Sequence, residues 1–164
     1  RPLTGCLYFG LMITPNGAKV IEYNCRFGDP ETQVVLPLLE TDIMDIIEAV
    51  WEEKLDTLDI KWSDKSCACV VMASGGYPEK YETGKVISGL DENGQCEGAF
   101  VYHAGTKLED GKFLTAGGRV LGITAYGDTL KEALDTAYKA VDTISFEKAH
   151  YRHDIGKKAL SALK

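Results

Sequence analysis

The sequence has no long apolar run and no excess of positive charge. No stretch approaches the roughly 20 apolar residues that a membrane-spanning helix needs, and no signal-peptide pattern stands at its start. The formal net charge of −7 argues against a general affinity for nucleic acid or anionic lipid, although it leaves room for a local basic pocket. We therefore expect a cytoplasmic protein with no nucleic-acid partner and no membrane partner.

Cysteine and histidine are scarce, and their spacing indicates neither a disulfide framework nor a zinc site. The cysteines number five, and the near neighbours Cys67 and Cys69 are most simply interpreted as core thiols of one apolar strand. None of His103, His150 and His153 pairs with cysteines at zinc-finger spacing. We expect reduced cysteines and no structural zinc site.

Several catalytic and nucleotide-binding motifs are also missing. The sequence contains no Gly-x-Ser-x-Gly elbow and no cysteine in a recognisable catalytic setting, which does not support a covalent hydrolase. It contains no P-loop motif and no Gly-x-Gly-x-x-Gly after a strand. If the protein uses a nucleotide, most of the nucleotide site must lie outside this segment.

The composition is that of a folded segment. Its 164 residues are 45% hydrophobic and 26% charged, enough for one core or two small ones. The chain starts with Arg1-Pro2-Leu3-Thr4 and enters strand-like sequence directly, so we expect it to be cut from a longer chain.

An alternating stretch between residues 20 and 33 organises the sequence. Because side chains of a strand alternate between two faces, Glu22, Asn24 and Arg26 are expected on one side, about 7 Å apart in succession. The other side would carry residues able to pack a core, namely Ile21, Tyr23, Cys25 and Phe27.

The polar side of this stretch suggests chemistry. Glu22 and the Asn24 carbonyl are hard oxygen ligands of the kind that hold Mg²⁺ beside phosphates, and Arg26 can bind a phosphoryl or carboxylate oxygen. The same alternation also fits the solvated face of a surface strand, and spacing alone does not separate the two interpretations.

Gly28, Asp29 and Pro30 then break the strand. We expect Asp29 to be the N-cap of a helix and Pro30 its first residue. A strand that leads straight into a helix N-terminus offers free backbone N–H groups to an anion.

Residues 5–14 and 18–26 are predicted to pair as a hairpin around a turn at residues 15–17. Gly10 would permit a close backbone approach beside the polar face. A helix over residues 30–39 must kink or end at Pro37.

A second helix is predicted to begin near Thr41 or Asp42. Its apolar stripe is most simply explained as core packing and consists of Ile43, Ile46, Ile47, Val50 and Trp51.

The remainder of the sequence predicts an antiparallel sheet with one long helix. Polar residues 55–65 are the best candidate for a joint between two lobes. Strands are expected at 68–73, 85–87, 99–103, 113–115 and 119–125. Thr129 and Glu132 form a capping box at the start of a helix with apolar residues up to Ile144. A helix laid on such a sheet gives an α+β lobe.

Six motifs, in order, resemble those of one enzyme family. They are the segments 5–12, 20–33, 70–78, 103–106, 117–122 and 151–156. Their amino-acid sequences are similar to those of the phosphoribosylamine-glycine ligases, or glycinamide ribonucleotide synthetases, of the ATP-grasp superfamily. The resemblance implies that residues 1–60 are the C-terminal part of an ATP-grasp domain and that residues 66–164 are the C-terminal α+β lobe of such an enzyme.

The resemblance also implies a reaction. Such enzymes join glycine to 5-phosphoribosylamine with ATP, through glycyl phosphate, in purine biosynthesis. It assigns Glu22 and Asn24 to Mg²⁺ or Mn²⁺ and Arg26 to the transferring phosphoryl group. The adenine-binding part of the family lies upstream, so we expect this chain alone to be inactive. A non-catalytic structural lobe and another ATP-grasp purine ligase are the alternatives.

The phosphorylated acceptor substrate needs a cationic or N–H-rich recess. Two corners qualify on the sequence. One is formed by Gly28 and Asp29, and the other by Gly118 and Arg119 with assistance from Lys107.

Overall fold

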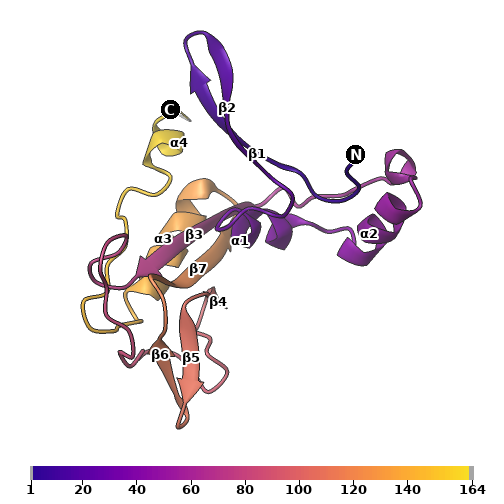
Figure 1. Cartoon of the computed structure of the whole chain (residues 1–164). Helices are drawn as coiled ribbons and strands as arrows, with labels where there is room; N and C mark the ends of the chain where they lie inside the picture. The colour runs from indigo at the N-terminus through magenta and orange to yellow at the C-terminus, as the bar shows by residue number, and fades with distance from the viewer. Residues whose placement is uncertain (1, 163–164) are drawn as a thin grey trace. The chain divides into compact units, whose positions relative to one another are not determined.

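The structure is a computed structural model that describes residues 2–162 (Figure 1). The chain divides between Ser63 and Asp64 into two compact units. Within residues 2–162, no helix combines the length and apolar character needed to cross a membrane.

The first unit contains the predicted hairpin. Strand β1 (Tyr8–Thr14) pairs antiparallel with β2 (Gly17–Asn24). The register has one irregularity, because Gly10 lies opposite Glu22 while Leu11 lies opposite Val20. Ile21 is therefore an extra residue in β2, as in a β-bulge, and the simple alternation expected there is interrupted.

The apolar side of this hairpin is exposed, and the expectation that it packs a core is wrong. Ile21 is 63% exposed, Tyr23 61% and Phe27 46%. The rings of Phe9 and Tyr23 meet edge to face with centroids 5.1 Å apart. A two-stranded hairpin has no second layer of its own, so its apolar residues find only such cross-strand partners.

The helical part of the first unit is short and irregular. It comprises α1 (Thr32–Val35), the 3-10 turn η1 (Leu36–Leu38), α2 (Ile43–Trp51) and the 3-10 turn η2 (Leu55–Thr57). Pro37 lies in η1, so the predicted end of the α-helix near this proline is confirmed.

Helix α2 begins as predicted, because the Asp42 side chain accepts a hydrogen bond of 2.8 Å from the Met44 N–H. Its apolar stripe does not form a core. Trp51 is 82% exposed and Ile47 52%, and the helix has no buried residue. The interpretation of this stripe as core packing is therefore wrong within residues 2–162.

The second unit is a mixed α and β lobe with antiparallel sheets, which confirms the fold class in outline. Three strands lie in the order β3 (Ser66–Ala73), β7 (Arg119–Gly127) and β4 (Phe100–His103). A separate hairpin pairs β5 (Thr106–Glu109) with β6 (Lys112–Thr115). The expected strand at 85–87 is reduced to one isolated bridge, between Val86 and Leu114.

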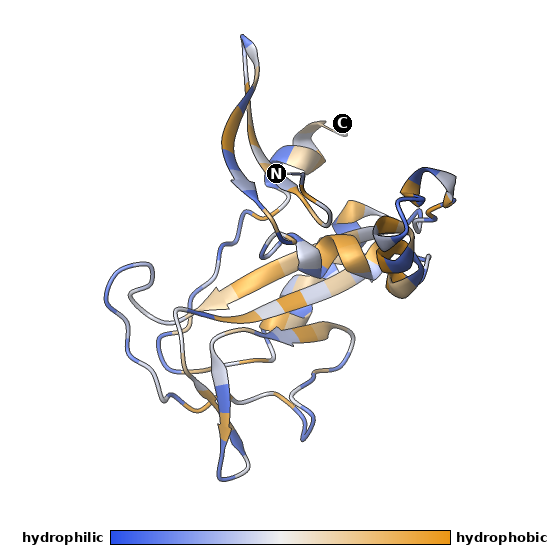
Figure 2. Cartoon of the chain, turned by 45° about the vertical axis from the view of Figure 1, so that its right-hand side comes forward, coloured by the Kyte–Doolittle hydropathy of each residue, from blue (hydrophilic) through white to orange (hydrophobic). Residues whose placement is uncertain are grey.

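Helix α3 (Leu130–Val141) packs on the three-stranded sheet, and the short helix α4 (Lys157–Ala162) follows near the end of the chain. The predicted capping box is present: the Thr129 side chain accepts from the Glu132 N–H, and the Glu132 carboxylate accepts from the Thr129 N–H. In Figure 2 the long strands of this sheet are coloured largely as hydrophobic. The core between sheet and helix includes Val70, Met72, Val120, Leu121, Ile123, Ala137 and Val141.

Candidate functional site

Glu22 and Asn24 lie on one face of the hairpin. Their cross-strand partners are Gly10 and Tyr8, and directly opposed residues of an antiparallel pair share a face. A Cβ built on Gly10 would lie 2.8 Å from the Glu22 Cγ, so only glycine at that position lets the glutamate side chain cross the strand as it does. Gly10 is thus closely approached, but by the Glu22 side chain and not by the backbone as the sequence suggested.

Asn24 is the last residue of β2 and lies opposite Tyr8, the first residue of β1. Its Nδ2 atom is buried and has no hydrogen-bond partner within residues 2–162. A buried amide without a partner costs free energy, which is unusual at a purely structural position. The Asn24 side chain therefore has an N–H donor that no acceptor within residues 2–162 uses.

The donor set fits a magnesium or manganese ion only in part. A carboxylate and a carboxamide oxygen on one face are ligands that such hard cations prefer. Over residues 2–162, no group of three or more histidine, cysteine, aspartate or glutamate side chains could hold a metal ion. Glu22 and Asn24 would therefore contribute part of a coordination shell, and water or phosphate oxygens would have to supply the rest.

Arg26 does not belong to the strand alternation, because β2 ends at Asn24. It lies in a bend, is exposed, and donates from Nη1 to the Phe27 carbonyl at 2.8 Å. The expectation that Arg26 shares a strand face with the two oxygen ligands is therefore wrong. The Arg26 charge still acts on Tyr8. It lowers the pKa of Tyr8, although the contributions of Glu31, desolvation and Glu22 together raise that pKa.

Tyr8 and Glu31 belong to the same site and were not predicted. The Tyr8 hydroxyl donates to Glu31 Oε1 at 3.1 Å. This bond is the main reason that the pKa of Tyr8 is raised, followed by desolvation and by the nearby charges of Glu31 and Glu22. The available signal was the spacing of Tyr8 and Gly10, which places both on one face of β1.

Gly28 is buried where this strand runs into the next segment. A Cβ on Gly28 would lie 2.5 Å from Glu31 Oε2 and 3.0 Å from Tyr8 Cε2. The absence of a side chain at Gly28 thus lets the tyrosine and the glutamate meet over the backbone.

Asp29 is not the N-cap that the sequence suggested. Helix α1 starts at Thr32 with Glu31 at the cap position, and Asp29 Oδ1 accepts from Gln33 Nε2 at 3.0 Å. The Thr32 N–H already donates to the Gly28 carbonyl at 3.2 Å. The prediction of free N–H groups at this helix N-terminus is therefore wrong. The Thr32 N–H is already used in a turn hydrogen bond, and α1 has only four residues.

The Gly118 and Arg119 corner of the second unit is tied down by main-chain bonds. Ser74 donates from Oγ to the Gly117 carbonyl and from its N–H to the Gly118 carbonyl, each at 2.8 Å. The Gly105 N–H donates to the Arg119 carbonyl at 2.8 Å. Backbone rigidity at this corner therefore comes from two loops distant in sequence.

Two tyrosines cover Gly118. A Cβ on Gly118 would lie 2.2 Å from Tyr77 Cδ2 and 3.1 Å from Tyr81 Cε1. The two rings contact each other with centroids 6.0 Å apart. The close approach expected of a ligand is made here by an aromatic side chain, and substrate binding by Gly118 stays a prediction.

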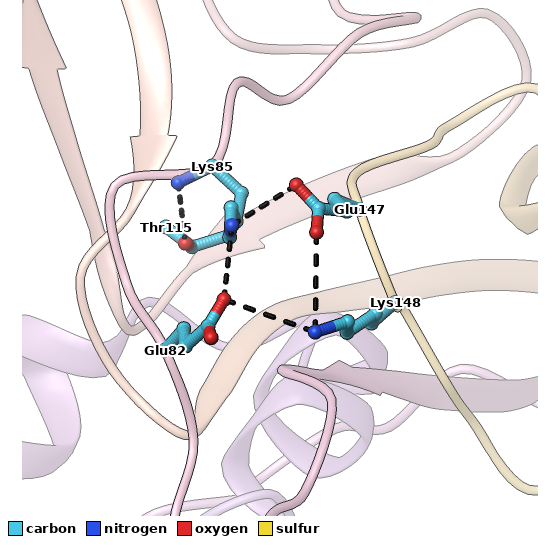
Figure 3. A network of polar contacts seen from close by, with 5 residues as sticks. All are labelled: Glu82, Lys85, Thr115, Glu147 and Lys148. Atoms are coloured by element: carbon cyan, nitrogen blue, oxygen red, sulfur yellow. Dashed lines mark hydrogen bonds and ion pairs between the residues drawn. The ribbon is translucent and has the colours of Figure 1, made fainter.

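A charge network fixes the loop that carries these tyrosines (Figure 3). Lys85 Nζ lies 3.0 Å from carboxylate oxygens of both Glu82 and Glu147, and Lys148 completes the network at 3.9 and 4.0 Å. The hydrogen bonds with Glu147 and then Glu82 raise the pKa of Lys85, and the bond with Lys85 lowers the pKa of Glu82. The Lys85 N–H also donates to Thr115 Oγ1, as Figure 3 shows.

Lys107 lies on β5 and pairs with Glu109 of the same strand. It stands two residues beyond Gly105, whose N–H contacts the Arg119 carbonyl. Binding of substrate by Lys107 stays a prediction.

Comparisons with known proteins match both units. The family described as "Phosphoribosylglycinamide synthetase, C domain" matches residues 67–158, and "Phosphoribosylglycinamide synthetase, ATP-grasp (A) domain" matches residues 1–32. A phosphoribosylamine–glycine ligase of Caldanaerobacter subterraneus is 56% identical over 92% of this chain, and one of Synechocystis is 52% identical over 95%. These matches cover 36% and 38% of the relatives' own lengths.

The fold is similar to that of a crystallised protein. The phosphoribosylamine–glycine ligase of Thermotoga maritima superposes with a TM-score of 0.77 at 33% identity, over 90% of this chain and 36% of that one. The chain therefore spans somewhat over a third of the proteins that it resembles.

Proposed function

The chain belongs to the phosphoribosylglycinamide synthetase family, and from this premise we propose that it is the C-terminal part of a ligase that uses ATP to join glycine to 5-phosphoribosylamine. The reaction would pass through glycyl phosphate and give glycinamide ribonucleotide, ADP and phosphate in cytoplasmic purine biosynthesis. Residues 1–60 would close the ATP-grasp domain, and residues 66–164 would form the C-terminal lobe.

The observation that carries the proposal is the shared face of Glu22 and Asn24 across from Gly10 and Tyr8. When bound there, Mg²⁺ or Mn²⁺ neutralises charge between phosphate groups during phosphoryl transfer. Glu22 and Asn24 hold it through their oxygens, and the glycine opposite leaves room for the glutamate to do so. The unpartnered Asn24 Nδ2 is an N–H donor, so it would not bind the cation but would be available to a phosphate oxygen beside it.

Arg26 is proposed to steady the transferring phosphoryl group. Its position beyond the end of β2 supports this role, because a bend lets a long side chain reach over the strand end. The guanidinium is exposed and permanently charged, and its fork geometry matches phosphoryl oxygens.

Two corners, each within one unit, are proposed as candidates for binding the acceptor substrate: Gly28 and Asp29 in the first unit, and Lys107, Gly118 and Arg119 in the second. Arg119 carries most of this proposal, since a phosphate group needs a cation and the surrounding main chain is held rigid. Gly28 and Asp29 contribute through the turn that contains them, in place of the helix N-terminus first expected.

The isolated chain is proposed to be inactive, because the chain spans only 36% of a ligase such as that of Caldanaerobacter subterraneus. Calorimetry with ATP and Mg²⁺ tests this point. Micromolar affinity of the 164-residue chain for ATP would contradict it.

The main experiment compares Glu22→Gln with Glu48→Gln in the full-length ligase. Both changes remove one exposed carboxylate, but Glu48 lies on α2 away from the hairpin face. We expect Glu22→Gln to lower metal-dependent ATP turnover by roughly 100-fold or more and to raise the Mg²⁺ concentration for half-activity, with Glu48→Gln near wild type. Near-normal turnover in Glu22→Gln would remove the metal assignment.

A further inference from the structure

The connection between β4 and β5 lies against the basic corner of the second unit. Strand β4 ends at His103 and pairs with β7, which begins at Arg119. Strand β5 begins at Thr106 and carries Lys107 as its second residue. The connection therefore links the strands that hold the two cations assigned above to the acceptor substrate.

Gly105 packs its main chain directly on the start of β7. Its N–H donates to the Arg119 carbonyl at 2.8 Å, and its carbonyl accepts from the Ala116 N–H at 2.6 Å. A Cβ on Gly105 would lie 2.6 Å from the Arg119 carbonyl oxygen and 2.7 Å from Gly117 Cα, so a larger residue would separate the two segments. A displacement of the connection is therefore passed to the Arg119 backbone.

The His103 imidazole spans this connection and uses both of its nitrogens. Nε2 lies 2.9 Å from the Gly94 carbonyl oxygen, and Nδ1 lies 2.9 Å from Thr106 Oγ1. Because a carbonyl oxygen only accepts, Nε2 carries the hydrogen, and in the neutral ring Nδ1 accepts from the Thr106 hydroxyl. The ring also contacts Phe113 of β6, with centroids 5.0 Å apart. Contacts with three separate segments therefore fix the orientation of the ring.

These contacts leave His103 no polar atom for a substrate. Each ring nitrogen has a single donor or acceptor position, and both positions are used within the chain. A direct bond from the imidazole to a substrate would cost one of them. The ring can act on the basic corner through Thr106, which immediately precedes Lys107. It also fixes the two ends of the connection in which Gly105 holds the Arg119 carbonyl.

We propose that His103 is a positioning residue for the acceptor substrate. Through its bond to Thr106 it holds Lys107 and Arg119 in one arrangement before the substrate phosphate arrives. A site that is ordered in advance loses less conformational entropy on binding. The proposal rests on the proposed function, since it takes the basic corner as the acceptor site, and adds a residue that acts without touching the substrate.

Two substitutions separate the two hydrogen bonds of His103. His103→Asn keeps an acceptor oxygen near the Nδ1 position for Thr106, whereas His103→Gln keeps an N–H near the Nε2 position for Gly94. Both lose the imidazole contact with Phe113, so each is the control for the other in general loss of packing. In the full-length ligase we expect His103→Gln to raise the KM for phosphoribosylamine by roughly 10-fold and His103→Asn by less than about 3-fold. The KM values for glycine and ATP should stay near wild type in both.

Thr106→Val removes the same bond from its other side and keeps the shape of the side chain. We expect a similar rise in the KM for phosphoribosylamine, roughly 10-fold. The double variant with His103→Gln should be no worse than either single variant, because each change already removes the one shared interaction. Additive effects would mean that the two side chains act separately, and would contradict the proposal.

Hydrogen exchange tests the clamp without the reaction. In the 164-residue chain, NMR follows the Gly105 N–H, which donates to the Arg119 carbonyl. The control is the Ser88 N–H, which donates to the Ser145 carbonyl at 2.8 Å and belongs to a different pair of segments. We expect the Gly105 N–H to exchange at least about 10-fold faster in His103→Gln than in His103→Asn, with equal rates at Ser88.

Two results would overturn the proposal while the acceptor site stands. One is an equal KM for phosphoribosylamine in His103→Gln and His103→Asn when Arg119→Ala raises that KM. The other is faster exchange of the Gly105 N–H in His103→Gln with no change in that KM, which makes the clamp purely structural. An unchanged KM in Arg119→Ala is a distinct outcome, because it removes the basic corner as the acceptor site and the proposal with it.

Discussion

The Tyr8 hydroxyl donates a hydrogen bond to Glu31 Oε1 at 3.1 Å, and this bond connects the first strand to the cap position of α1. It passes over Gly28, where a side chain would collide with both residues. The carboxylate of Glu31 is thereby held at the end of the hairpin that carries Glu22 and Asn24.

Tyr8→Phe removes only the donor of this bond. In the full-length ligase we expect kcat to fall by roughly 10-fold, about the effect of one lost hydrogen bond to a charged group. Steady-state kinetics measure the change, with Tyr23→Phe as the control because Tyr23 is exposed on the other side of the hairpin. Equal kcat values for the two variants would make the bond purely structural.

Arg119→Ala tests the basic corner of the second unit. We expect the KM for phosphoribosylamine to rise by roughly 10- to 100-fold, as for a lost charge-assisted contact, while the constants for glycine and ATP stay near wild type. Arg152→Ala is the matched control, since Arg152 is exposed and pairs with Asp154. Three unchanged constants for Arg119→Ala would place this residue outside the substrate site.

Gly118→Ala should destabilise the second unit, because the new Cβ would lie 2.2 Å from Tyr77 Cδ2. Overpacking of this kind costs about 1–3 kcal/mol. Denaturant unfolding of the 164-residue chain measures the loss. The double variant with Tyr77→Ala should be less destabilised than the sum of the two single changes, and strict additivity would argue against the clash.

Thr129→Ala removes one half of the capping box at α3. We expect a loss of about 1 kcal/mol and a Tm lower by roughly 2–4 °C for a chain of this size. Lys139→Ala, on the exposed side of the same helix, is the control for surface substitution. A Tm equal to that of the control would mean that another group caps the helix.

The Cys67 thiol should react slowly at moderately alkaline pH. Desolvation, and next the neighbouring Cys69, raise its pKa from 9.0 to about 11. At pH 8 the folded chain should therefore react with iodoacetamide at Cys67 roughly 100-fold more slowly than the urea-unfolded chain. Mass spectrometry after timed quenching measures this ratio.

The same pKa difference sets a pH dependence of stability. Because the folded pKa lies above the unfolded one, the stabilising contribution of Cys67 is complete below about pH 9 and is lost as pH rises toward 11. Cys67→Ala should flatten the decline of unfolding free energy over that window. A decline of equal slope in the variant would assign it to other groups, such as Tyr102 and Tyr126, whose pKa values are also raised by desolvation.

Local sequence signals predicted the elements whose formation depends on near neighbours. The Pro15-Asn16-Gly17 turn, the Asp42 cap and the Thr129 capping box all appear where the sequence placed them. The turn between β5 and β6 is equally local, since its two residues, Asp110 and Gly111, are adjacent and both have positive φ. Each of these features involves groups within a few residues of one another.

The errors arise where another contact takes the same group or where the strand pairing stops. Asp29 was expected to cap a helix, but Gln33 takes its carboxylate, and Glu31 stands at the cap while it holds Tyr8. Arg26 was expected in the strand, but the ladder ends at Asn24. Periodicity could not reveal these outcomes, because side-chain alternation holds only while the partner strand continues.

The sequence by itself determined the family, the hairpin that carries Glu22 and Asn24, and the long capped helix. It could do so because motifs and short-range periodicity depend only on neighbouring residues. Tertiary structure alone decided which apolar residues are buried, which glycine is covered by Tyr77, and that Tyr8 and Glu31, 23 residues apart, share one hydrogen bond. The physical reason is that burial and close approach depend on the pairing of distant segments, and a one-dimensional pattern carries no information on which segment arrives to make the contact.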